Sequence, residues 1–235
     1  MNDQPKQPKY EMSKPSVTFV ADTKPNIEKY PEIQTAEQLI VWHARISSPE
    51  NREKLEGSKL LKYLIEHKHW SPFEMASLTL EIDTSLDIAT QMIRHRSFSW
   101  QQLSRRYKGG DIEFMEIEAR LQDTKNRQNS IELTPDQESL DTWLKTEYYK
   151  VVCVAAQLYQ DALDKGISKE VARKVLPVNL KTTLDMTGTL RSWIHYIDAR
   201  TNPDTQKEHR WVAEQAKKIF IERYPIISKA KGWIE

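Results

Sequence analysis

Residues 76–107 read ASLTLEIDTSLDIATQMIRHRSFSWQQLSRRY, and three patterns follow one another in this stretch. Apolar and polar side chains alternate over 76–82, which predicts a half-buried strand. From about Ser85 to His95 the apolar residues recur at helical spacing, which predicts a helix. Its opposite side carries Asp87, Gln91, Arg94 and His95. The remainder is basic and interleaved with aromatic residues, so we expect a turn followed by an extended segment there.

The rest of the chain predicts more helix than strand. The spacing of Thr35 and Gln38 is that of a capping box and opens a helix that runs to Ala44. Further helices are expected from Ser58 and over 134–166, 168–176, 190–200 and 204–223, and further strands over 112–117 and 182–186. Because strands and helices do not alternate regularly, the expected class is α+β, a helix-rich single domain with a small sheet.

The distribution of polar and apolar residues predicts one domain that follows a polar N-terminal segment. Residues 1–26 are polar and contain several prolines, so we expect a flexible lead-in before one catalytic domain over 27–235. Residues 121–133 are polar and predict a surface loop. Thr134-Pro135 is a typical helix start and Gly166 a typical helix end.

Composition excludes several classes of protein. The 235 residues include 35 Lys and Arg against 34 Asp and Glu, a near-balance that argues against a protein wrapped along nucleic acid. Mean hydropathy is −0.70, and no apolar run approaches the roughly 20 residues of a membrane span. None of the 6 glycines falls in a GxGxxG or P-loop pattern, so a Rossmann-type or Walker-type site is not expected.

Two features of the sequence indicate the cellular compartment. Cys153 has no partner for an internal disulfide, which suits a reducing cytoplasm. The start of the chain lacks the apolar segment of a secretory signal. We therefore expect a cytoplasmic protein.

The densest chemical signal is the basic stretch 94–107. Guanidinium groups bind phosphate in a bidentate manner, and hydroxyl groups complete such a site. An arbitrary basic cluster is more often a solvated surface, but here Phe98, Trp100 and Leu103 alternate with the polar residues and must be partly buried. A second interpretation is a nucleic-acid-binding module in which Phe98, Trp100 and Tyr107 stack on bases.

A second cluster, HKHWSPFE, occupies residues 67–74. Two histidines and a glutamate suggest a metal, and a metal-dependent nucleotide hydrolase using His67, His69, Glu74 and His95 is an alternative hypothesis. However, His67 and His69 do not share a helix face, and the chain has no HxxxH or HExxH pattern. Structural histidines are the favoured interpretation, and no metal site is expected.

Taken together, the motifs resemble those of the flavin-dependent thymidylate synthases. Arg94-His95-Arg96, seven residues and Ser104 form the RHR(x)7S signature of that family. Residues 67–74 are similar to its flavin-contacting segment. ARIS at 44–47, VARKVLPVNL at 171–180, and Arg191 and Arg200 followed by Gln206 and Glu208 also match in the family's order. The resemblance covers about residues 44–218.

This resemblance implies an activity and a set of site residues. The implied reaction is the reductive methylation of dUMP to dTMP, with FAD, with NADPH as reductant and with methylenetetrahydrofolate as carbon donor, in a homotetramer with shared active sites. The FAD site would comprise Ser71, Arg94, His95, Arg96, Gln102, Thr189, Arg191 and His195. The dUMP site would comprise Gln91, Arg94, Gln102, Ser104, Arg105, Arg106, Arg173 and Arg200.

Arg200 is the implied catalytic residue, because a fixed positive charge beside the uracil ring stabilises its anionic form. Cys153 lies among valines in a long helix, a poor environment for a nucleophile, and is expected to be a small core hydrophobe. For Ser104 a positioning role is preferred over a nucleophilic one, since no Ser-His-Asp pairing follows from the sequence.

Three positions depart from the family pattern. Gln102 stands where Glu is usual, which removes one negative charge beside flavin and substrate. His195 and Thr189 stand where asparagines are common. Asp204 replaces the usual His, which changes one flavin contact.

Overall fold

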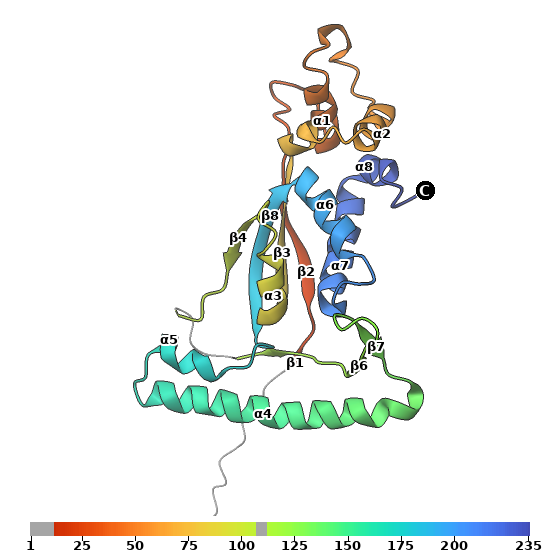
Figure 1. Cartoon of the computed structure of the whole chain (residues 1–235). Helices are drawn as coiled ribbons and strands as arrows, with labels where there is room; N and C mark the ends of the chain where they lie inside the picture. Colours follow the sequence, from red (N-terminus) through yellow and green to blue (C-terminus); the bar gives the residue numbers. More distant parts are fainter. Residues whose placement is uncertain (1–11, 107–111) are drawn as a thin grey trace, which may run out of the picture.

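A four-stranded antiparallel sheet forms the centre of the computed structural model, which describes residues 12–106 and 112–235 (Figure 1). The strand order is β2-β3-β8-β4. These strands are β2 (Ser16–Asp22), β3 (Ser77–Ser85), β8 (Lys181–Thr189) and β4 (Ser99–Gln102). The longest ladder joins β3 to β8 and runs from Ser77 opposite Thr189 to Ser85 opposite Lys181.

The two faces of this sheet differ. On one face Leu78, Leu80 and Met186 are fully buried beneath three helices. These are α3 (Leu86–Met92), α6 (Leu190–Arg200) and α7 (Lys207–Arg223). The opposite face is polar, and there the Thr79 hydroxyl donates a hydrogen bond to the Thr187 hydroxyl at 2.8 Å. Alternation along each strand thus separates a core face from a polar one.

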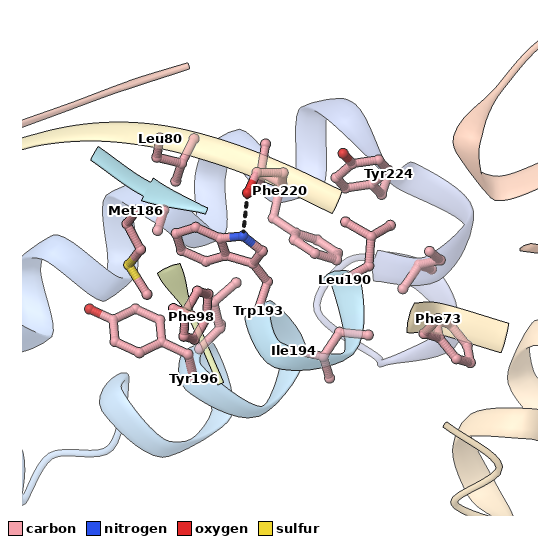
Figure 2. Packing of buried hydrophobic residues seen from close by; sticks show 14 of the residues in the cluster. Phe73, Leu80, Phe98, Met186, Leu190, Trp193, Ile194, Tyr196, Phe220 and Tyr224 are labelled. Carbon is pink, nitrogen blue, oxygen red and sulfur yellow. Dashed lines mark hydrogen bonds between the residues drawn. The ribbon is translucent and has the colours of Figure 1, made fainter. Parts of the chain in front are cut away.

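Trp193 fastens α6 to the sheet. Its indole Nε1 donates a hydrogen bond to the carbonyl oxygen of Leu78 at 2.9 Å, drawn as the dashed line in Figure 2. The ring is fully buried, and the Phe98 ring meets it edge-on with centroids 5.0 Å apart. A buried indole with a satisfied N–H contributes a large apolar surface without an unpaired donor.

Smaller elements occupy the two ends of the sheet (Figure 1). Beside the start of α6 lie α1 (Ala36–Ala44), η1 (Pro49–Asn51), α2 (Ser58–Glu66), η2 (Ser71–Met75) and α8 (Pro225–Ala230). At the other end lie α4 (Glu138–Asp164), α5 (Lys169–Ala172) and η4 (Arg173–Val175). There Val152, Ala156 and Tyr159 of α4 form a second buried cluster with Phe114 and Leu180.

Four short strands and one turn complete the chain. Strand β1 (Met12–Ser13) pairs in parallel with β5 (Phe114–Met115), and β6 (Arg120–Gln122) pairs antiparallel with β7 (Ser130–Glu132). The one-turn helix η3 (Pro135–Gln137) precedes α4. In the part of the chain described, no helix combines the length and the apolar composition needed to cross a membrane.

The expected α+β class is confirmed, and so are several local predictions. Thr35 caps α1 and forms the expected capping box with Gln38. The strand expected from residue 76 is β3, and the chain turns and extends after Met92 as predicted. A second capping box, formed by Thr134 and Gln137, precedes the long helix α4.

Other expectations need correction. Within the flexible lead-in expected over 1–26, residues 16–22 are β2, whose backbone hydrogen-bonds to β3; residues 1–11 lie outside the described residues. The loop expected over 121–133 contains the β6–β7 hairpin. Helix α3 ends at Met92 rather than His95, and α7 begins at Lys207 rather than Asp204.

Pro225 and Cys153 also differ from expectation. Pro225 ends the helical run as predicted but also opens α8, because proline is well suited to the first turn of a helix. Cys153 is half-buried, and its neighbours Val151 and Val154 are exposed, so it is not the core hydrophobe that was expected. Tyr107 lies outside the described residues.

Gly188 tests how tightly β8 and Phe98 pack. A Cβ at Gly188 would lie 2.4 Å from Cδ1 of Phe98, far below van der Waals contact. We expect Gly188→Ala to lower the free energy of unfolding by about 1–3 kcal/mol through overpacking. Urea denaturation measures this loss, and in a Phe98→Ala background the same substitution should cost much less. Equal costs in the two backgrounds would show that this contact does not limit residue 188.

Candidate functional site

The N-terminal half of α6 brings three sequence segments together. Arg191 forms an ion pair with Glu74 of η2. The Ser192 hydroxyl donates a hydrogen bond to the carbonyl oxygen of Ser97 at 3.2 Å. The ring of His195 meets Trp70 edge-on at 4.7 Å between centroids. These contacts place η2 and the turn 94–97 beside one helix.

Most of the residues assigned to FAD by resemblance lie on these segments. Ser71 is the exposed first residue of η2, and Thr189 is the N-cap of α6, where its hydroxyl accepts a hydrogen bond from the Ser192 amide. Arg94, Arg96, Arg191 and His195 are exposed, and His95 is half-buried. Gln102 is the exception, because it ends β4 and donates to the Thr182 hydroxyl at 3.3 Å.

Most of the residues assigned to dUMP form a separate group at the other end of α3. A cavity of about 570 Å³ is lined there by Gln102, Ser104, Arg105 and Arg173, together with one side of α3. Arg106 lies close by in the chain and forms an exposed ion pair with Glu170 of α5.

Gln91 and Arg200 do not line this cavity. Among the described residues, the lining includes Asp87 and Thr90 of α3 but not Gln91, Arg94 or Arg200. The structure therefore divides the residues assigned to dUMP into two groups within one chain.

Arg200 is held by a histidine. Its Nε donates a hydrogen bond to Nε2 of His95 at 2.8 Å. That nitrogen must therefore carry a lone pair, which makes His95 neutral. Burial lowers the pKa of His95, and the neighbouring Arg200 charge lowers it further. No described residue accepts a hydrogen bond from the terminal nitrogens of Arg200, so these remain available to a ligand.

Behind His95 lies a buried pair, Tyr196 and His209. The Tyr196 ring meets His95 edge-on at 5.0 Å, and its hydroxyl lies 3.1 Å from Nε2 of His209. On its other side, His209 Nδ1 lies 3.3 Å from Oε1 of Gln91. Burial is the main cause that lowers the pKa of His209 to about 3, and the positive charge of Arg200 lowers it further. Burial also raises the pKa of Tyr196, so both groups are neutral near pH 7.

Sequence reasoning missed His209 and Tyr196 as parts of the site. Tyr196 falls between two residues of the apolar face of α6. His209 lies three and four residues before Val212 and Ala213, on the buried face of α7. A histidine on an apolar helix face is a signal for a buried polar contact, but it does not identify the partner.

The histidines of residues 67–74 lie at the surface. His67 stacks on Tyr63 at 4.0 Å between centroids, and His69 is also exposed. Across residues 12–106 and 112–235, no group of three histidine, cysteine or carboxylate side chains is placed to hold a metal.

Comparisons with known proteins agree on one family. The family model described as "Thymidylate synthase complementing protein" matches residues 30–226. A probable flavin-dependent thymidylate synthase of Paramecium bursaria Chlorella virus 1 is 47% identical over 220 residues, which cover 93% of this chain and 100% of the relative. A flavin-dependent thymidylate synthase of Synechocystis is 46% identical over 92% of this chain and 99% of its own.

A solved structure has the same fold. The UMP/dUMP methylase PolB of Streptomyces cacaoi, bound with 5-Br dUMP, superposes with a TM-score of 0.77 at 26% sequence identity. The match covers 94% of this chain and 96% of the methylase.

His209 makes stability depend on pH in a defined direction. Its pKa is about 3 when folded, against 6.5 ordinarily, so below 6.5 the unfolded chain binds a proton that the folded chain does not. Stability from this group is therefore lost as pH falls from 6.5 toward 3, by at most about 1.4 kcal/mol per pH unit. The measurement is urea unfolding of the wild type and of His209→Gln at pH 7 and pH 5.

The difference between the two proteins is the informative quantity. Glu37, whose pKa burial raises to about 7, changes stability in the opposite direction over part of this range, and the subtraction cancels its contribution. The advantage of the wild type over His209→Gln should shrink on going from pH 7 to pH 5. A constant difference would mean that His209 titrates normally.

Proposed function

Because the chain belongs to the flavin-dependent thymidylate synthase family, we propose that it methylates dUMP to dTMP with electrons from a bound flavin. The observation that carries this conclusion is the 47% identity to a relative whose whole length the chain covers. The structural neighbour that is a dUMP methylase supports the same substrate.

The surface around the start of α6 fits FAD. Exposed arginines at 94, 96 and 191 and the positive end of the α6 helix dipole offer positive charge to a pyrophosphate. Trp70 and His195 supply aromatic surface beside them. When bound, the flavin supplies the electron pair that reduces the transferred one-carbon unit to a methyl group. The residues assigned to it are Ser71, Arg94, His95, Arg96, Gln102, Thr189, Arg191 and His195.

We assign methylenetetrahydrofolate as the carbon donor and NADPH as the reductant. A methylene group becomes a methyl group only with two further electrons and a proton, so a reduced folate and a hydride source together balance the reaction. The family resemblance supports both assignments.

Arg200 is the proposed catalytic residue. Its Nε is fixed by neutral His95, so its terminal nitrogens can hold a ring oxygen of uracil and stabilise negative charge on the ring. The positive charge of Arg200 would thus activate the uracil ring without the addition of a cysteine thiolate to it. Cys153 lies on α4, which packs against a different cluster from the one around α6.

The cavity beside α3 is the proposed place of the dUMP phosphate. Arg105 and Arg173 provide guanidinium groups, and Ser104 provides a hydroxyl. Gln91 and Arg94 are assigned to the nucleotide as well. The proposed catalytic domain spans 27–235, and strand β2, which precedes it in the chain, pairs with its sheet. We place the protein in the cytoplasm, because a reducing compartment suits its single free cysteine.

We further propose that the protein is a homotetramer whose sites combine residues of different subunits. The two groups of nucleotide residues line different regions within one chain, which supports this arrangement. Helix α4 also leaves an apolar stripe uncovered, with Trp143 61% exposed and Val154 69% exposed. The other exposed members of this stripe are Leu140, Val151 and Leu158. A patch of this kind marks an interaction surface.

Removing Arg200 should separate two half-reactions. Arg200→Ala is expected to fold and bind FAD but to form dTMP on the order of 10²–10³ times more slowly, since one preorganised donor is lost. Flavin reduction by NADPH should fall much less. Stopped-flow absorbance follows the flavin, and quenched samples follow dTMP. Cys153→Ser is the control and should retain most activity; an equal collapse of both half-reactions would contradict the role of Arg200.

Mixing two inactive variants should restore activity if sites are shared. When Arg200→Ala and Arg173→Ala chains are co-expressed with different tags, about a quarter of the sites in mixed oligomers should hold both arginines. Neither variant alone can form such a site. Doubly tagged oligomers that remain as inactive as the separate variants would show that each site is built from one chain.

A further inference from the structure

The apolar stripe of α4 lies on a different side of the helix from the residues that pack on the rest of the chain. Val152, Ala156 and Tyr159 enter the second buried cluster. With about 3.6 residues per turn, the stripe lies about a third of a turn away from them. Val151, in the middle of the stripe, is 58% exposed, and in Figure 1 the helix crosses the end of the molecule beyond the sheet. The described parts of the chain therefore leave this side of α4 open to another molecule.

The stripe has the spacing of a coiled-coil seam. The residues that we call the α4 seam are 140, 144, 147, 151, 154 and 158, which are alternately four and three residues apart. All are apolar except Glu147, and all the apolar ones except the half-buried Leu144 are exposed. A strict repeat of about 3.5 residues keeps a narrow seam against one facing helix, whereas a helix on the surface of a globular core uses a broader stripe. The spacing therefore indicates that the partner is a helix.

A second copy of α4 is the partner that fits. The α4 seam extends about 27 Å, and its partner must offer a seam of similar length. In the described parts of the chain the next longest helix is α7 with 17 residues, and no large apolar side chain of α7 is exposed. Helix α4 itself has 27 residues and an open seam. Pairing of one surface with its own copy about a two-fold axis is the commonest arrangement in homo-oligomers.

The charges at the α4 seam select the relative direction of the two helices. Glu147 lies near the middle of the seam, and Lys150 Nζ lies 2.7 Å from its carboxylate. A parallel pair in register would place the two Glu147 side chains against each other, and like charges at an interface are costly. An antiparallel pair would place Glu147 of each copy beside Lys150 of the other, so charges of opposite sign alternate around the axis. It would also set the dipoles of the two helices in opposite directions.

The apolar positions of the seam match in the same antiparallel arrangement. A two-fold axis near residue 149 pairs Leu140 with Leu158, Leu144 with Val154, and Glu147 with Val151 of the other copy. Apolar residues therefore meet apolar residues toward both ends, and the charged residues lie at the centre. A single polar position of this kind specifies the register of a coiled coil.

We propose that α4 is a self-association surface, through which two copies of this chain form an antiparallel, left-handed helix pair about a two-fold axis near residue 149. The proposal deepens the homotetramer of the proposed function and rests on it. A tetramer of D2 symmetry is held by more than one kind of two-fold interface, and the α4 seam is one of them. The surface that joins the two groups of nucleotide residues is another.

Charge substitutions at Val151 test the pairing. Both Val151→Glu and Val151→Lys place a charge opposite Glu147 of the other copy, of like sign in the first variant and of opposite sign in the second. Sedimentation equilibrium gives the mass and the association constant of each protein. Val151→Glu should weaken association about a hundredfold or more and halve the mass at concentrations where the wild type stays assembled, and Val151→Lys should weaken it less.

Ile27→Glu is the matched control. Ile27 is 53% exposed and lies outside the α4 seam, so this variant adds the same charge at an exposed apolar position and should keep the wild-type mass. Circular dichroism shows whether each variant is folded. If Val151→Glu does not fold, Val154→Glu replaces it, because the side chain of Val154 is even more exposed.

Disulfide trapping tests the direction of the pair. In a Cys153→Ser background, a chain carrying both Leu144→Cys and Val154→Cys should form a covalent dimer under mild oxidation, and neither substitution alone should do so. The two positions are about 15 Å apart along one helix, too far for a disulfide within one chain. A parallel pair would instead join position 144 to position 144, so Leu144→Cys alone would cross-link.

Each outcome bears on a different statement. An unchanged mass in folded Val151→Glu, or stronger dissociation by Val151→Lys than by Val151→Glu, overturns the pairing of α4 seams. Cross-linking of Leu144→Cys alone overturns the antiparallel direction. A wild type that is monomeric at every concentration overturns the homotetramer together with the seam. Formation of dTMP by the wild type is measured separately, and its failure would overturn the proposed reaction without bearing on the α4 seam.

Discussion

The ladder between β3 and β8 is the constraint on which both halves of the site depend. At one end of it the Leu190 amide donates to the carbonyl of Ala76, and α6 begins beside η2. At the other end the Leu86 amide donates to the carbonyl of Leu180, and α3 begins beside the segment that carries Arg173. A register shift of one residue would turn the buried side chains of one strand to the polar face, so this pairing is strongly specified.

Local sequence signals predicted much of this frame. The capping box at Thr35 and the alternation of Leu78, Leu80 and Ile82 depend on neighbouring residues alone, and both are confirmed. Strand β2 was missed because five of its seven residues are exposed at the sheet edge, so burial imposes little alternation on it. The β6–β7 hairpin is too short and polar to differ from a loop in sequence.

The sequence motifs select candidate site residues but do not predict how those residues are arranged. The RHR motif contains His95, and the order of the motifs makes Arg200 the expected catalytic residue. The hydrogen bond that His95 accepts from Arg200 exists only because α6 packs against the turn after α3. The Tyr196–His209–Gln91 connection joins three separate helices, and no local pattern specifies it. Its consequence is electrostatic, because Arg200 is surrounded by neutral rings and no described carboxylate forms an ion pair with it.

The uncovered stripe on α4 bears on how a newly made chain survives. Until another surface covers Val151, Val154 and Leu158, the chain exposes apolar side chains that attract any other unfolded or partly assembled protein. Correct assembly and aggregation then compete, and both accelerate with concentration. In a homo-oligomer covered at this stripe, apparent stability rises with protein concentration, because association draws the folded subunits out of the unfolding equilibrium. Such an oligomer is therefore least stable in dilute solution.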